Sequence, residues 1–234
     1  MRLDKYLAQS GACIRSDVAK AVSDGRVAVN GAVCSRRDVS VCPEDTVTFD
    51  GIPVVYREHF YIMLNKPSGY VSTTLEEEGN SPSVMRLIPE AYRSRGLFPC
   101  GRLDKDTTGF LLITNDGGAA HRLLAPKKHV NKVYAFSCRL PLSEDDAGKL
   151  CGGVNIGDLV TMPAEITVTG STSGYITIKE GKFHQIKRMF EAVGNGITSL
   201  ERVEFGGVSL DRSLGAGEWR FLTSDEEKTL LGNI

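Results

Sequence analysis

The segment from residue 101 to residue 109, GRLDKDTTG, gathers side chains that could do chemistry. Glycines bracket it, and the apolar run 110–113 follows at once. Polar groups on a loop beside a buried strand are a common arrangement of catalytic residues. The carboxylate of Asp104, between Arg102 and Lys105, would stay ionised, as a nucleophile or a general base must. An acidic β-turn without chemistry explains the same residues equally well, and the spacing does not choose between the two.

A second polar segment, residues 180–190, leads into a predicted helix. Its apolar residues repeat at helical spacing, so one face of the helix packs on the core. Lys187 and Arg188 project away from that face. Cations near the start of a helix oppose its dipole unless they meet an anion, such as a carboxylate or a phosphate. The alternative is a surface helix whose cations pair with neighbours such as Glu191, and His184 alone is more typical of a structural residue.

Lys132 and Tyr134 form a third candidate. Residues two apart on a strand share one face, so this amine and this ring could hold a phosphate and stack a base. A half-buried tyrosine beside a lysine explains the pair as well. The segment 64–70 is predicted to be a turn that ends a strand, and it offers one basic side chain, Lys66.

The elements that would position these groups fall into two parts. At the N-terminus, Leu3 and Leu7 recur at helical spacing, and Ser16 is the expected N-cap of a second helix. Asn30-Gly31 lies between two short alternating segments, which is a strong hairpin signal. A domain boundary is expected near residues 54–60, where no periodicity is present.

The rest of the chain mixes strands and helices without a regular βαβ alternation. The predicted strands are 61–64, 110–114, 133–139, 164–168 and 175–179, and the predicted helices are 83–87, 119–124, 143–150, 184–193 and 224–230. The segments 76–82 and 93–96 are predicted to be exposed loops. This order predicts an α+β fold with a largely antiparallel sheet.

Composition excludes some classes of protein. With 41% apolar and 24% charged residues the chain matches average globular proteins. A net charge of -1 argues against coating nucleic acid by bulk charge, so such contacts would depend on local clusters. One basic cluster lies between Asp116 and Glu144, although alone it is more typical of a solvated face. Its members are Arg122, Lys127, Lys128, Lys132 and Arg139.

Cysteine usage and the N-terminus bear on the compartment. None of the six cysteines forms a C-x-x-C pair, and no histidine stands at zinc-ligand spacing from two of them. No signal peptide and no apolar run of membrane-spanning length is present. We therefore expect reduced thiols in a cytoplasmic protein with no metal and no membrane partner.

Taken together and in this order, the segments resemble the pseudouridine synthases of the RsuA type over nearly the whole chain. The block GRLDKDTTG resembles the catalytic motif of that family. The resemblance implies that Asp104 is the catalytic aspartate and that Arg102 helps to flip or replace the target base. Lys132-Val133-Tyr134 is similar to the family's K-x-Y element, whose tyrosine stacks on the uracil. EGKFHQIKRM resembles the motif whose basic residue pairs with the aspartate, which corresponds to Lys187.

Other matches concern the target RNA. Leu200 and Arg202 fit a late L-x-R element, and Arg188 is an expected RNA contact. The pair His184-Gln185 resembles the branch that acts on small-subunit rRNA, since large-subunit branches more often carry Arg before that Gln. The resemblance thus implies an rRNA pseudouridine synthase most like the one that modifies position 516 of 16S rRNA. The alternatives are the same chemistry on a 23S rRNA uridine, or a non-catalytic RNA-binding or ribosome assembly factor.

The N-terminal sixty residues resemble an S4 RNA-binding domain, on RLDKYLAQSG and the hairpin GRVAVNG. This implies a small S4-like αα-hairpin domain over residues 1–56, followed over 60–234 by a catalytic domain with a pseudouridine-synthase-type mixed, largely antiparallel sheet flanked by helices. The RNA contacts implied in the first domain are Arg2, Lys5, Arg15 and Arg26. One departure is Ile14, which replaces the usual Ser before Arg15, so the helix cap and a phosphate contact are expected to move to Ser16.

The implied reaction breaks the N1 glycosidic bond of a uridine, turns the uracil and rejoins it through C5. It needs no redox change and no external group, so no cofactor is expected. The carboxylate either adds covalently to the substrate or removes a ribose proton, and the sequence leaves both routes open. The implied partner is rRNA or its assembly particle, and the protein is expected to act as a monomer.

One rival interpretation remains. Residues 104–108 also fit D-x-D-x-T, the aspartyl-phosphate motif of haloacid-dehalogenase-like phosphatases. The residues before this motif, however, are a poor match for the buried strand that such an enzyme needs.

Overall fold

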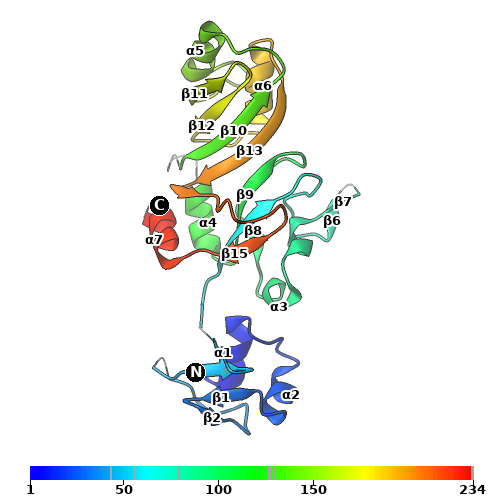
Figure 1. Cartoon of the computed structure of the whole chain (residues 1–234), viewed down its shortest axis with the longest axis vertical. Coiled ribbons are helices and arrows are strands. Elements are labelled where there is room, and N and C mark those ends of the chain that lie inside the picture. The colour runs from blue at the N-terminus through cyan, green and yellow to red at the C-terminus, as the bar shows by residue number, and fades with distance from the viewer. Residues whose placement is uncertain (43, 55, 79, 126–127, 129, 233–234) are drawn as a thin grey trace. The chain divides into compact units, whose positions relative to one another are not determined.

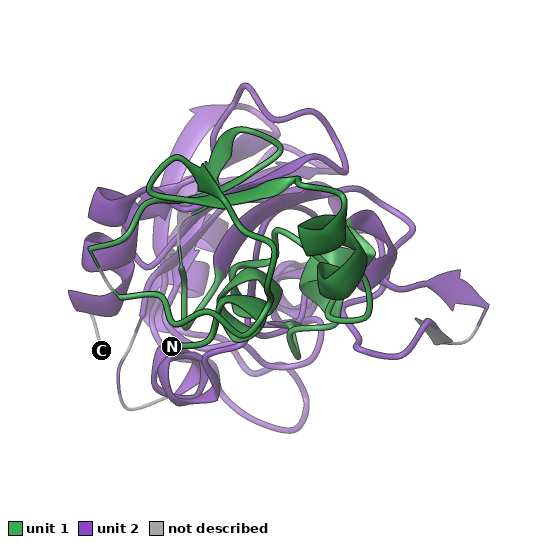
Figure 2. Ribbon diagram, turned by 90° about the horizontal axis from the view of Figure 1, so that it is seen from below, with its two compact units in different colours: residues 1–60, 88–97 green, residues 61–87, 98–234 purple. Residues whose placement is uncertain are grey.

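A computed structural model describes residues 1–42, 44–54, 56–78, 80–125, 128 and 130–232. The chain divides into two compact units, coloured in Figure 2. Unit 1 comprises residues 1–60 and 88–97, and unit 2 comprises residues 61–87 and 98–234. The segment 88–97, expected in the second domain, groups with unit 1 by its contacts.

Unit 1 contains the helix pair that the sequence predicts (Figure 1). The helices are α1 (Leu3–Ser10), α2 (Val18–Ser23) and α3 (Glu90–Arg93). Leu3 and Leu7 are buried in its core, as their spacing predicts. Gly11 ends α1 with a φ of 79°, and a Cβ there would lie 2.4 Å from the ring of Tyr92 on α3. Glycine is therefore required both by the backbone conformation and by the close approach of the ring.

Two hairpins complete unit 1. The strands are β1 (Val27–Val29), β2 (Ala32–Val33), β3 (Val47–Phe49) and β4 (Ile52–Val54), in the order β2-β1-β3-β4. Asn30-Gly31 and Asp50-Gly51 form the two turns with positive φ throughout, which matches the right-handed twist of the strands. The prediction that Ser16 caps α2 is wrong. Its hydroxyl donates to the Asp17 carboxylate at 3.0 Å, and no side chain caps that helix.

Unit 2 is built on one mixed sheet. Its strands run in the order β11-β12-β10-β13-β9-β5-β15, and the pairing of β13 with β9 is the parallel one in the described sheet. The predicted α+β class with a largely antiparallel sheet is confirmed. The strands of unit 2 are β5 (Tyr61–Lys66), β6 (Glu77–Glu78), β7 (Ser81–Pro82), β8 (Phe98–Pro99), β9 (Thr108–Thr114), β10 (Lys132–Cys138), β11 (Glu165–Gly170), β12 (Ser173–Ile178), β13 (Ile197–Phe205), β14 (Val208–Ser209) and β15 (Trp219–Phe221). Of these, β6 and β7 form a separate two-stranded sheet.

Helices flank this sheet (Figure 1). They are η1 (Val84–Leu87), α4 (Gly117–Leu124), α5 (Glu144–Gly152), α6 (Gln185–Ala192) and α7 (Ser224–Gly232). The apolar face of α6 packs on the sheet through Phe190, whose ring centroid lies 4.9 Å from that of Phe136 on β10. The central strands β5 and β9 are buried almost throughout. They therefore form a rigid part of the core to which the polar loops are attached.

The longest strand, β13, is absent from the predicted elements. Charged residues interrupt its apolar pattern: Glu201, Arg202 and Glu204 stand among buried positions such as Leu200 and Phe205. The strand pairs with β10 along most of its length and reaches β9 only at residues 201–202. It therefore joins the two halves of the sheet. No helix in the described ranges is long and apolar enough to cross a membrane.

Candidate active site

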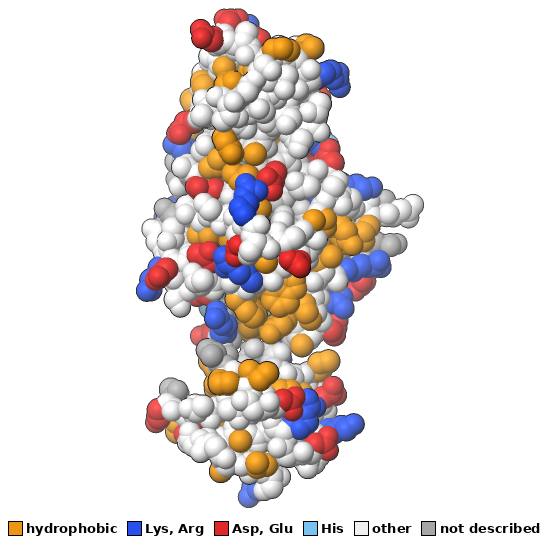
Figure 3. Space-filling model, in the orientation of Figure 1, with side chains coloured by type: hydrophobic (Ala, Val, Ile, Leu, Met, Phe, Trp, Pro, Cys, Tyr) orange, Lys and Arg blue, Asp and Glu red, His pale blue; other side chains and the backbone are white. Residues whose placement is uncertain are grey.

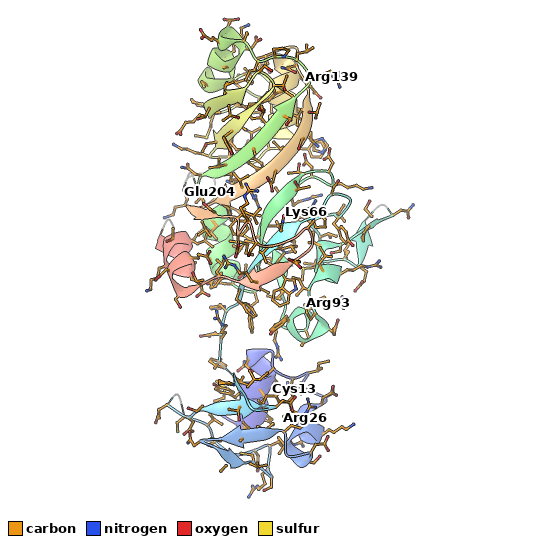
Figure 4. All side chains as sticks on the ribbon, in the orientation of Figure 1. Cys13, Arg26, Lys66, Arg93, Arg139 and Glu204 are labelled. Atoms are coloured by element: carbon orange, nitrogen blue, oxygen red, sulfur yellow. The ribbon has the colours of Figure 1, made fainter. Side chains whose placement is uncertain are left out.

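Lys66 binds the backbone of the loop that carries Asp104. This lysine is completely buried, and its ammonium donates to the carbonyls of Pro67, Lys105 and Thr107 at 3.1, 3.2 and 2.8 Å. Burial lowers the pKa of Lys66 to about 8, while the carboxylates of Asp106 and Asp104 oppose that shift. Figure 4 shows Lys66 in the middle of unit 2. The turn ending β5 thus supplies a cation that fixes the backbone of the loop.

Two further contacts define the shape of the loop. The Ser72 hydroxyl accepts from the amide of Leu103 and donates to its carbonyl, both at 3.1 Å. At the other end, Gly109 has a φ of 94°, and a Cβ there would lie 2.3 Å from the Arg202 carbonyl oxygen. A larger residue would push β13 away from β9. The second glycine of GRLDKDTTG is therefore explained by close backbone approach.

Asp104 meets its predicted partner. The Lys187 ammonium, from the first turn of α6, lies 3.2 Å from Oδ2 of Asp104 and 2.5 Å from Oδ1 of Asp106. His184 also approaches, with Nε2 3.7 Å from Oδ1 of Asp104. Burial opposes a charged Lys187, but the bond to Asp106 and the charge of Asp104 together raise the pKa of this lysine. Asp104 is therefore held beside a cation that stays protonated at neutral pH.

Asp106 and His184 were not predicted as members of this group. Asp106 stands two residues after Asp104, and burial works against its charged form while the bond to Lys187 lowers its pKa. His184 lies three residues before Lys187, one helical turn away, and that spacing was the available signal. The carboxylate at 104 therefore has neighbours beyond the single cation that the sequence predicts.

Asp104, His184 and Lys187 line a cavity of about 660 Å³ in unit 2, within the usual range for a small-molecule site. Tyr134 on β10 lines the same cavity and is 7% exposed. It is the direct cross-strand partner of Arg202 on β13. The structure therefore brings together the three residues expected to be catalytic, Asp104, Tyr134 and Lys187, although they come from a loop, a strand and a helix distant in the sequence.

Two buried cations form one wall of the cavity. Arg202 donates from Nε to the Phe110 carbonyl at 2.6 Å, and its Nη2 has no hydrogen-bond partner among the described residues. Lys132 donates to the Val130 carbonyl at 3.2 Å. Burial, then the charge of Arg202, lowers the pKa of Lys132 to about 8. Uncompensated buried cations are costly, so this wall suits a bound group that carries negative charge or oxygen acceptors.

The charge of the cavity lining is strongly one-sided. Its acidic member among the described residues is Asp104, whereas its basic members are Arg102, Lys105, Lys132, Lys182, Lys187 and Arg202. On the face shown in Figure 3, by contrast, basic and acidic side chains are interspersed. The excess of positive charge in the cavity lining can attract phosphates.

Some predicted RNA contacts lie elsewhere. Arg188 is bonded to the Asp158 carboxylate and the Ile156 carbonyl and does not line the cavity. Within the basic cluster of residues 122–139, Lys132 is buried and Lys127 lies outside the described residues. Figure 4 shows Arg139 at the far end of the sheet from Lys66. The cluster is therefore not one continuous surface in the described part of the chain.

The predicted contacts of unit 1 are all exposed. Arg2 is paired with Asp4 at 2.6 Å, and Arg26 with Asp50 at 2.5 Å. Lys5 and Arg15 stand on α1 and in the loop before α2. Exposed ion pairs of this kind contribute little to stability and open readily, so these side chains remain accessible to RNA.

The aspartyl-phosphate alternative does not fit this geometry. That chemistry places its aspartate at the end of a buried parallel strand. Asp104 instead precedes β9, and the segment before it, β8, is a two-residue strand antiparallel to β9.

Comparison with known proteins identifies the family of the chain. Residues 60–192 match the family model described as RNA pseudouridylate synthase, and residues 1–47 match the S4 domain. The chain is 47% identical over 232 residues to the uncharacterized RNA pseudouridine synthase YtzG of Bacillus subtilis, covering 97% of this chain and 96% of that protein. It is 38% identical over 230 residues to ribosomal small subunit pseudouridine synthase A of Escherichia coli, covering 97% and 98% of the two chains.

A solved structure agrees with both matches. The crystal structure of a pseudouridylate synthase superposes with a TM-score of 0.68 at 35% identity, covering 98% of this chain and 99% of that one. The chain therefore belongs to the RNA pseudouridylate synthase family, in the RsuA-like group that carries an S4 domain, and it is an isomerase that acts on RNA.

Proposed function

We propose that this RNA pseudouridine synthase isomerises one uridine of small-subunit rRNA, with Asp104 as the catalytic carboxylate. The observation that carries the assignment of residues is the pairing of Asp104 with Lys187 at 3.2 Å in a cavity that Tyr134 also lines. A carboxylate, a cation paired with it and an aromatic ring are the groups that the reaction needs.

Asp104 acts on the ribose or on the uracil. The N1–C1′ bond breaks, the uracil turns, and a C5–C1′ bond forms while the C5 proton is lost and N1 gains one, so atoms balance without a co-reactant. In one route the carboxylate adds covalently to the substrate, and in the other it removes a ribose proton. Lys187 stabilises the carboxylate by charge in a partly dehydrated site.

Tyr134 offers its ring to the uracil. A uridine must leave its stack to reach Asp104, which costs a few kcal/mol. Stacking on an aromatic side chain is worth about 1–3 kcal/mol, so the ring recovers part of that cost. Because Tyr134 is 7% exposed, its position is fixed by packing before RNA arrives.

The cations around the cavity then have separate roles. Arg102 is exposed on its rim and is placed to occupy or widen the gap left by the flipped base. Lys132 and Arg202 form the buried wall, where the unpartnered Nη2 of Arg202 suits a phosphate or carbonyl oxygen of the bound nucleotide. Arg188, held by Asp158, contacts RNA only if that pair opens.

The choice of small-subunit rRNA is supported by the Escherichia coli relative, whose printed name is ribosomal small subunit pseudouridine synthase A. Within that RNA we propose position 516 as the target. The pair His184-Gln185 supports it too. Gln185 is 4% exposed and bonded to Glu180 and Lys182, so it influences target choice through the shape of the turn rather than by touching RNA.

Unit 1 supplies the second RNA contact, as expected for an S4 domain. We propose that four basic residues bind phosphates there: Arg2, Lys5, Arg15 and Arg26. We also propose that residues 1–56 and 60–234 are the functional domains. The protein is proposed to act as a monomer. Since its substrate is rRNA or an assembling ribosomal particle, we place it in the cytoplasm.

Mapping of pseudouridines tests the assignment. Carbodiimide-stop primer extension over both rRNAs, with and without the gene, is expected to show one stop in small-subunit rRNA that disappears in the deletion strain. A lost stop in 23S rRNA would instead show the same chemistry on the large subunit. An unchanged pattern, combined with RNA binding, would show a non-catalytic factor.

A further inference from the structure

Phe183 is exposed in an unusual place. Phe183 is 75% exposed, which is the largest exposed fraction among the large apolar residues of the described chain. It also lines the cavity that holds Asp104. A lone exposed apolar side chain is ordinary, but this one stands at the rim of a site that must take up RNA.

The backbone conformation of the turn at residues 182–185 accounts for the exposure of Phe183. His184, the next residue, has a φ of 49°, a left-handed conformation that costs a non-glycine residue about 1 kcal/mol or more. Gln185 holds this turn: its Oε1 accepts from the amide of Lys182 at 2.9 Å, and its Nε2 donates to the buried Glu180 at 2.9 Å. The turn is therefore fixed by a buried network, and the exposed ring is part of a rigid feature.

The ring of Phe183 is also stacked on that of His184. Their centroids lie 3.8 Å apart and their planes differ by 18°. One side of His184 thus meets Phe183, and its Nε2 points to Asp104 at 3.7 Å. The pair forms a short aromatic column whose inner end is at the catalytic carboxylate and whose outer end is open to solvent.

The surrounding charge favours a nucleotide. Lys182 precedes Phe183 in the turn, and Arg102 and Lys105 line the same cavity, all three exposed. An aromatic face beside basic side chains is the arrangement that binds single-stranded nucleic acid, because each base has a π-face and each phosphate a negative charge.

We propose that the Phe183–His184 column binds the base of a nucleotide next to the target uridine in the RNA. This inference rests on the proposed function. Tyr134 is buried and takes the flipped uracil, whereas Phe183 is at the exposed rim and cannot be the floor of the pocket. Flipping a uridine removes a stacking partner from its neighbours, and Phe183 replaces that partner.

Substitutions at 183 separate stacking from apolar contact. With RNA oligonucleotides covering position 516 of 16S rRNA, Phe183→Ala is expected to raise KM about tenfold with kcat changed much less, since stacking is a binding term. Phe183→Trp should restore the original KM, and Phe183→Leu should not. Val168→Ala is the matched control, because Val168 is 48% exposed on β11 and does not line the cavity.

A double-mutant cycle identifies the base. Nucleotides flanking the uridine are replaced one at a time by an abasic ribose, and affinity is measured by fluorescence anisotropy in an Asp104→Asn background, where no turnover is needed. One abasic position should abolish the difference in affinity between the protein that keeps Phe183 and the Phe183→Ala variant. If every abasic RNA keeps that difference, or if Leu serves as well as Phe, the proposal is overturned.

The two proposals fail differently. Absence of pseudouridine with the unsubstituted protein would contradict the proposed function, whatever the anisotropy shows. Pseudouridine formation without coupling between Phe183 and any flanking base would contradict the inference alone.

Discussion

Lys187 lies closer to Asp106 than to Asp104, with Nζ–O distances of 2.5 and 3.2 Å. The lysine of α6 is thus shared between two carboxylates of one loop. Asp106 is largely exposed, with 67% of its side chain accessible, whereas Asp104 is 26% accessible. We interpret Asp106 as a second partner of Lys187 that takes no part in the reaction, and Asp104 as the group that reacts.

Removing the charge at 104 tests its role directly. Asp104→Asn is expected to lower turnover by more than about a thousandfold, because the amide can neither add to the substrate nor accept a proton. Tritium release from C5-labelled uridine RNA measures this, and gel shift and thermal unfolding check binding and fold. Substantial release by the folded variant would refute the assignment.

Substitutions at Lys187 and at its second partner, Asp106, should differ in their effect on activity. Lys187→Gln is expected to lower kcat by about a hundredfold, a typical cost for a lost charge-stabilising group. Asp106→Asn should stay within a few fold of the original activity, since Lys187 can then pair fully with Asp104. Comparable losses in both variants would mean that Asp106 has a direct part in the reaction.

The ring of Tyr134, rather than its hydroxyl, should govern RNA affinity. Tyr134→Phe is expected to bind RNA with little loss, whereas Tyr134→Ala should lose the equivalent of about 1–3 kcal/mol of stacking. Gel-shift titrations of both variants provide the measurement. Equal losses for Phe and Ala would exclude stacking as the main contribution.

Lys66 should make stability depend on pH. Its pKa is about 8 in the folded protein against an ordinary value of 10.5, so between these pH values the unfolded chain holds a proton that the folded one lacks. The free energy of unfolding therefore rises with pH from about 8 to 10.5, by up to about 1.4 kcal/mol per pH unit. That gain is lost as pH falls back to 8, below which the group has no further effect. Lys132 contributes in the same window.

Urea unfolding at pH 8, 9 and 10 measures that dependence. Lys66→Met should flatten the slope, and Lys228→Met, at a lysine whose side chain is 77% exposed, should leave it unchanged. An unaltered slope in Lys66→Met would show that the ammonium is not desolvated as the structure indicates.

Gly109 should tolerate no side chain. Gly109→Ala combines a φ of 94° with a Cβ 2.3 Å from the Arg202 carbonyl, so we expect a loss of about 1–3 kcal/mol or more in the free energy of unfolding. Gly148→Ala is the control, because that site in α5 is open and alanine favours a helix by about 1 kcal/mol. Calorimetry showing equal stability for both variants would contradict the close approach of β9 and β13.

Local elements and the chemistry of single segments can be read from the amino-acid order alone. Asn30-Gly31 predicts a hairpin because both residues accept positive φ, and the apolar repeat around Met189 predicts α6 because a 3.6-residue period is visible without a partner. The order of the motifs is enough to indicate the family, and it singles out the aspartate, the tyrosine and the lysine one by one.

Which of these groups meet depends on how the chain packs. Charged residues interrupt the apolar pattern of β13, so this strand was missed. Periodicity tells which face of a strand is buried but not which strand lies beside it, so the insertion of β13 between β10 and β9 could not be foreseen. That insertion pairs Tyr134 with Arg202. The partners of Lys66, Arg188 and Asp106 were hidden for the same reason: hydrogen bonds between distant segments form only in the folded chain, and local spacing does not encode them.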